Sequence, residues 1–154
     1  MAITLLISCR QDGPSVTAST DTPTCDTNQN YAKTPAEAAQ RVVGEWKLRN
    51  IIGGYILSPP PVPDQTIVFS QDGSCVITED GQRSGSFMYK VGTIQNFVGT
   101  GLLLPSLTVS DTTQTTPDRI RIGGPVAMFV CDNQLILDYG RPVDAGAYVY
   151  QKTK

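Results

Sequence analysis

The chain has 154 residues, a formal net charge of −2 and no histidine. Lysines and arginines are scattered, and this excludes the clustered basic face that nucleic-acid binding requires. Without histidine the chain has no Ser-His-Asp triad, no Cys-His nucleophile and no imidazole zinc site. No spacing of acids or cysteines suits a metal ion or a redox cofactor. We therefore expect a protein that is not an enzyme, without a cofactor and without a nucleic-acid partner.

The first nine residues are apolar and end in a cysteine. The segment Leu6–Cys9 resembles the lipobox of bacterial lipoproteins, in which the cysteine is acylated and becomes the new N-terminus. A signal peptide also carries a charged start and a longer apolar region, so we interpret residues 1–9 as a truncated lipoprotein signal. The alternative is an apolar start with an unrelated cysteine. The resemblance implies a lipid anchor at Cys9, a membrane partner, and a location in a bacterial envelope on the outer membrane, at its periplasmic or surface face.

Residues 10–33 are rich in Ser, Thr, Asp, Asn, Gly and Pro and contain almost no aliphatic side chain. Such a segment buries too little apolar surface to offset the entropy of ordering it. We expect a disordered tether, with a root-mean-square reach of about 27 Å if it behaves as a flexible coil.

Thr34 and Glu37 predict the start of a helix. Thr34 can cap the amide of Glu37, Glu37 can reach back to the Thr34 amide, and Pro35 suits the first helical position. Good helix formers follow over residues 36–43, and Gly44 is a residue type that ends helices. A helix this short does not hold alone and has to pack against other structure.

From Trp46 onward the chain alternates apolar and polar residues in short segments separated by turn signals such as Asp72-Gly73 and Asp80-Gly81. The expected strands cover residues 46–51, 66–70, 75–78, 86–91, 102–104 with 107–109, 119–122 continuing after a bend or bulge into 126–131, 135–139 and 148–150. Sequential hairpins favour an antiparallel meander, and a meander removes its edges by closing into a barrel. We expect an all-β, eight-stranded antiparallel barrel over residues 34–154, preceded by one short helix, with a sandwich as the alternative.

Three segments of this domain resemble the small lipocalin-like proteins of bacterial envelopes, which have calycin-type barrels. They are Val43–Leu48 with its Gly-Glu-Trp, Ile67–Gly73, and Ala147–Lys152. In the lipocalin group the tryptophan lies at the closed end of the barrel, and a basic residue lies across it. The resemblance therefore implies structural roles for Gly44, Trp46 and Lys152 at the barrel floor, with Arg141 as a weaker candidate for the basic residue.

Four apolar residues, Ile67, Phe69, Phe87 and Tyr89, lie at alternate positions of two expected strands. They can line a cavity for an apolar ligand, or they can fill the interior, because an eight-stranded barrel is just wide enough for either. The sequence favours neither.

The chain has four cysteines. If Cys9 is acylated, three thiols remain. A bridge between Cys75 and Cys131 is the pairing we expect if one forms, and buried free cysteines are an equal alternative.

Two functions fit these observations. The first is a lipid-anchored, lipocalin-like barrel that binds a small hydrophobic molecule. The second is a packed barrel that acts as a structural, inhibitory or interaction module and holds no internal ligand; the sequence does not indicate its protein partner.

Overall fold

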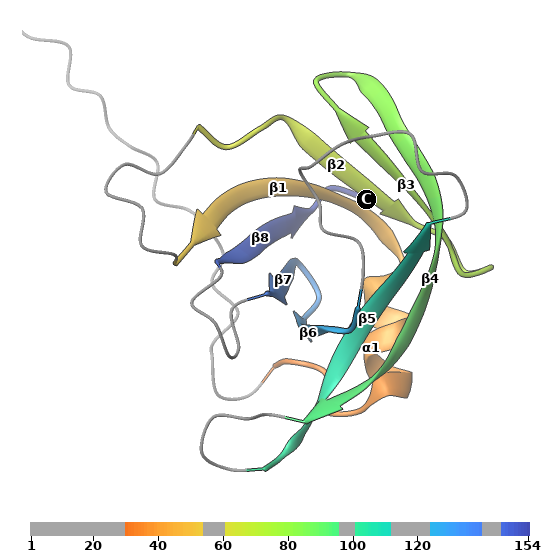
Figure 1. Ribbon diagram of the computed structural model, residues 1–154, viewed down its shortest axis with the longest axis vertical. Helices are drawn as coiled ribbons and strands as arrows, with labels where there is room; N and C mark the ends of the chain where they lie inside the picture. Colours follow the sequence, from red (N-terminus) through yellow and green to blue (C-terminus); the bar gives the residue numbers. More distant parts are fainter. Residues whose placement is uncertain (1–29, 54–60, 96–100, 112–123, 140–145) are drawn as a thin grey trace, which may run out of the picture.

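The computed structural model describes residues 30–53, 61–95, 101–111, 124–139 and 146–154. Eight antiparallel strands form a closed barrel in which each strand pairs with the next and the last pairs with the first (Figure 1). One short helix precedes the first strand. The predicted fold is confirmed. No helix in the described part of the chain is long and apolar enough to cross a membrane.

The helix α1 (Pro35–Val42) begins as predicted. The Thr34 hydroxyl accepts a hydrogen bond from the Glu37 amide at 3.2 Å. The Glu37 carboxylate, however, accepts from the amide of Lys33 at 2.9 Å and not from that of Thr34. Its other oxygen contacts Arg41 at 2.7 Å, so this carboxylate joins both ends of the helix.

The strands are β1 (Gly44–Ile52), β2 (Gln65–Phe69), β3 (Ser74–Glu79), β4 (Gln82–Gln95), β5 (Leu103–Asp111), β6 (Val126–Val130), β7 (Gln134–Asp138) and β8 (Ala147–Lys152). The stretch expected at 102–104 with 107–109 forms the single strand β5, which begins at Leu103. Pro105 has no backbone N–H to donate in this strand. It lies just before Ser106, where pairing with β6 begins. A proline is tolerated there because no neighbour on that side requires its amide. The strand expected at 119–122 lies outside the described residues.

The barrel has two different ends. The odd-numbered strands begin and the even-numbered strands end on one side of the barrel, together with α1, which contacts β4, β5 and β6; we call this the helix end. The odd-numbered strands end and the even-numbered strands begin on the other side, which we call the mouth end. Between them the inward residues of every strand form one apolar core.

The first described residues already belong to the barrel, although the tether was expected to run to residue 33. The amide of Ala32 donates to the carbonyl of Val130 at 2.9 Å. The ring of Tyr31 meets that of Phe129 edge to face at 5.7 Å, and its hydroxyl donates to Gln134 at 3.2 Å. Tyr31 and Ala32 therefore already pack against β6 and β7. The remainder of the expected tether and Cys9 lie outside the described residues.

Candidate functional site

The helix end is closed by Trp46, whose side chain is 0% exposed. Its indole N–H donates to the carbonyl of Val42, the last residue of α1, at 2.6 Å. Lys152 pairs with Trp46 across β8 and β1, and its Nζ lies 5.2 Å from the centroid of the indole ring. The structure thus brings Trp46 and Lys152 together at the helix end. Arg141 lies outside the described residues.

Gly44 is required where α1 turns into β1. Its φ is +134°, and a Cβ at this position would lie 2.6 Å from the Lys154 carbonyl and 2.7 Å from Cε of Lys152. Any side chain would therefore force the C-terminal residues away from the helix end.

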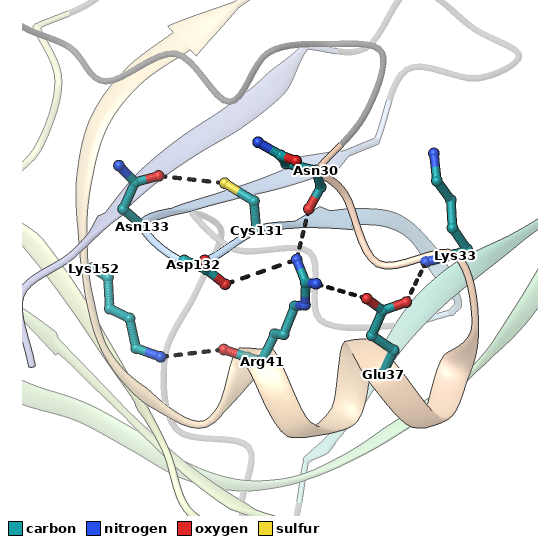
Figure 2. A network of polar contacts seen from close by, with 8 residues as sticks. All are labelled: Asn30, Lys33, Glu37, Arg41, Cys131, Asp132, Asn133 and Lys152. Atoms are coloured by element: carbon teal, nitrogen blue, oxygen red, sulfur yellow. Dashed lines mark hydrogen bonds and ion pairs between the residues drawn. The ribbon is translucent and has the colours of Figure 1, made fainter.

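A polar network surrounds this floor, and Arg41 is at its centre (Figure 2). The guanidinium donates to the Asn30 carbonyl at 2.6 Å and lies 3.8 Å from the Asp132 carboxylate. The carbonyl of Arg41 accepts from Lys152 Nζ at 3.3 Å. One residue of α1 therefore connects the entering chain, the β6–β7 turn and the last strand. We interpret this network as structural.

The four residues that the sequence left as either cavity lining or interior filling all belong to the apolar core or pack against it: Ile67, Phe69, Phe87 and Tyr89. The rings of Phe69 and Tyr89 meet edge to face at 5.0 Å. The Tyr89 hydroxyl donates to the Ser70 carbonyl at 2.8 Å, and the Phe87 ring lies over Gly85 of its own strand. These aromatic rings pack on one another and on backbone.

The other half of the core carries polar groups. Gln65, at the start of β2, is 2% exposed, and Tyr150 in β8 is 1% exposed. The Tyr150 hydroxyl donates to Gln65 Oε1 at 2.8 Å. Because β1 lies between β8 and β2, this hydrogen bond spans the inner face of β1. It places an amide and a phenol inside an otherwise apolar barrel.

A pair of phenols also lies towards the mouth end. The rings of Tyr139 and Tyr148 meet edge to face at 5.2 Å. Burial, and then the neighbouring Tyr148, raises the pKa of Tyr139 to about 12. Burial raises the pKa of Tyr150 well above its usual value, with smaller contributions from Tyr139, Tyr148 and Glu79. Tyr139 and Tyr150 therefore stay neutral hydrogen-bonding groups near pH 7.

We define the mouth-end cluster as Gln65, Tyr139, Tyr148 and Tyr150. Its residues can offer an amide and neutral phenols to a molecule whose remaining surface is apolar, the arrangement typical of small-molecule sites. Our sequence analysis missed these residues. The sequence signals that could have identified them are the alternate positions of Tyr148 and Tyr150 in the last strand and the inward position of Gln65, two residues before Ile67.

The cysteines differ from the expected pairing. Cys75 is a buried free thiol, and burial raises its pKa to about 11. Cys131 is disulfide-bonded, and its partner lies outside the described residues. The Cys75–Cys131 bridge does not form. Cys75 lies between Phe69 of β2 and Phe87 of β4 in the strand register, on the core side of β3, and Cys131 follows β6 at the helix end.

Comparisons with protein-family models, curated proteins and solved structures returned no match. The class of protein that the fold defines is a closed, eight-stranded antiparallel meander barrel with a helix beside its floor.

Proposed function

We propose that this protein is a non-enzymatic, lipid-anchored barrel of the bacterial envelope that binds a small, largely hydrophobic molecule in the mouth-end half of its interior. The observation that carries the proposal is the buried hydrogen bond between Tyr150 and Gln65. A hydrogen-bonded polar pair inside an apolar core contributes little to stability beyond what apolar residues would supply. A role in orienting a ligand would explain why this buried polar pair is present.

Two further observations support the proposal. The fold is compatible with the lipocalin-like group that the sequence resembles, because the barrel is closed, is a meander and has its tryptophan at the helix end. The lipobox-like Leu6–Cys9 supports a lipid anchor. A barrel held at a membrane is well placed to take up an apolar molecule from it.

One observation favours the second candidate, a packed barrel that acts through contacts with a protein. The rings of Phe69, Phe87 and Tyr89, which the sequence left as either cavity lining or interior filling, fill space at the helix end. If packing of this kind continues to the mouth, no room for a ligand remains.

Native mass spectrometry of the full chain, expressed in a bacterium and never denatured, tests ligand binding. We expect a species heavier than the polypeptide that loses its extra mass on extraction with organic solvent. The double variant Gln65→Leu/Tyr150→Phe keeps side-chain volume but removes the polar pair, and it should retain less of the ligand. Tyr89→Phe removes a phenolic hydroxyl group from the helix-end half and serves as the matched control. Only the bare polypeptide mass in the wild type would favour the packed barrel.

The anchor is tested separately in a bacterial host that processes lipoproteins. We expect the wild type to sediment with membranes and to carry acyl mass, and we expect Cys9→Ser to lose that acyl mass. A wild-type protein that never acquires acyl mass would overturn the anchor.

A further inference from the structure

The hairpin formed by β4 and β5 extends beyond its neighbours at the helix end. Pairing between β3 and β4 reaches only Met88, and pairing between β5 and β6 starts at Ser106. Beyond these points β4 and β5 pair only with each other, as far as Gln95 opposite Leu103. We call the described residues 90–95 and 101–105 the hairpin arm. Figure 1 shows the arm projecting past the barrel.

The described end of this arm carries apolar side chains on both faces, beside the polar Gln95 opposite Leu103. Leu102 is 61% exposed and Leu103 is 66% exposed. Ile94 and Leu104 face each other across the two strands, and both are partly exposed. Side chains alternate between the faces of a strand, so Leu103 lies on one face and the Ile94–Leu104 pair on the other. A partner that covers one face would leave apolar side chains in water on the other.

Beyond Lys90 at its base, the arm also lacks charge. No Lys, Arg, Asp or Glu occurs in residues 91–110, although 17% of the whole chain is charged. Exposed strand ends usually carry charges that prevent association. An apolar medium can surround an uncharged tip and cover the apolar side chains on both of its faces, whereas a flat protein surface can cover only one face.

The position of the arm agrees with this. The chain enters the described structure at Asn30, whose carbonyl is bound by Arg41 of α1, and α1 contacts both β4 and β5. The 29 residues before Asn30, including Cys9, therefore join the domain at the end where the arm projects. A membrane anchor at Cys9 would hold this end of the barrel nearest the bilayer.

We propose that the described end of the hairpin arm, through Leu102 and Leu103, inserts into the interfacial region of a phospholipid bilayer and orients the barrel on the membrane. The proposal rests on the envelope location under "Proposed function" but not on acylation, because the arm supplies its own apolar contact.

The test uses the full chain with Cys9→Ser, which removes the acylation site and leaves the arm. We expect this protein to sediment with phosphatidylcholine vesicles and to remain bound at high salt, because the contact carries no charge. Adding Leu102→Asp and Leu103→Asp should lower the partition coefficient by at least about tenfold, given the apolar area that these side chains bury. The matched control is Ile52→Asp, which adds a charge at a side chain that is 52% exposed at the mouth end and should leave binding unchanged.

Three results would overturn the proposal: a Cys9→Ser protein that stays in the supernatant, a double aspartate variant that binds as well as its parent, or binding that salt abolishes. Sedimentation equilibrium provides one more outcome. A Cys9→Ser dimer that the aspartates dissociate, without vesicle binding, would assign the arm to self-association. The milder Leu103→Ser provides a second variant if the double one misfolds. Acyl mass on the wild type is measured independently, so failure of the anchor and failure of the arm are distinguishable.

Discussion

Lys152 Nζ lies 5.2 Å from the centroid of the Trp46 ring and donates to the carbonyl of Arg41 at 3.3 Å. One ammonium group thus joins the last strand to both the barrel floor and the last turn of α1. Trp46 is anchored in its turn by the carbonyl of Val42. The two ends of the barrel sequence therefore meet at a single buried indole.

Because Trp46 closes the floor, Trp46→Ala should lower the free energy of unfolding by about 3–5 kcal/mol, the usual range for removing a large buried ring. Urea titration followed by circular dichroism measures this. Trp46→Phe keeps most of the apolar contact but leaves the Val42 carbonyl without its donor, so its loss should be smaller. An alanine variant with wild-type stability would contradict the floor role.

Gly44→Ala should destabilise the domain by about 2–4 kcal/mol, because the backbone there has a positive φ and the new methyl group meets the C-terminal residues. Gly81→Ala is the matched control: its φ is +75°, but a Cβ would meet nothing within 4 Å, so only the backbone cost of about 1 kcal/mol applies. Fluorescence of Trp46, the single tryptophan, follows unfolding of both variants. Equal losses would show that the close approach at Gly44 is unimportant.

Tyr150→Phe should cost about 1–3 kcal/mol, because it leaves the buried Gln65 amide without its donor. Gln65→Leu in the same background should recover much of that loss, since two apolar residues leave no unsatisfied group. The measurement is a double-mutant cycle by urea denaturation. If the two single losses simply add in the double variant, the pair is not coupled.

The buried phenols predict alkaline unfolding. Burial raises the pKa of Tyr139 from 10.0 to about 12, so its contribution to stability is present below pH 10 and is lost as the pH rises through about 12. The change for this one residue is about 3 kcal/mol, since one pKa unit corresponds to about 1.4 kcal/mol. Urea midpoints measured across this range, with phenolate absorbance as a second readout, test it. Tyr139→Phe should flatten the dependence, and an unchanged slope would contradict the assignment.

The thiols should react in a fixed order. In the native protein near pH 8, an alkylating reagent should leave Cys75 unmodified, because its thiol is buried with a pKa raised to about 11. In denaturant without reductant Cys75 should react and Cys131 should not, because Cys131 is in a disulfide. Reductant should then expose Cys131. Peptide mapping by mass spectrometry reads each site, and alkylation of Cys131 without reductant would be the contrary result.

The sequence alone determined the kind of fold. The Thr34 cap and Gly44 bounded the helix, turn residues divided the remainder into short strands, and alternation gave each strand an apolar face. These are local signals, since they depend on backbone preference and on burying every second side chain. The resemblance around Trp46 also located the floor, where Lys152 is found.

The tertiary structure decided which residues meet inside the barrel. Tyr150 and Gln65 are 85 positions apart in the chain, and only closure of β8 onto β1 brings them together, so no local pattern could pair them. The same holds for Cys75, because whether a thiol on an inward strand position finds a partner depends on the opposite wall. The extension of β4 and β5 beyond their neighbours was likewise invisible in the alternation, because it is set by where β3 and β6 stop pairing with them.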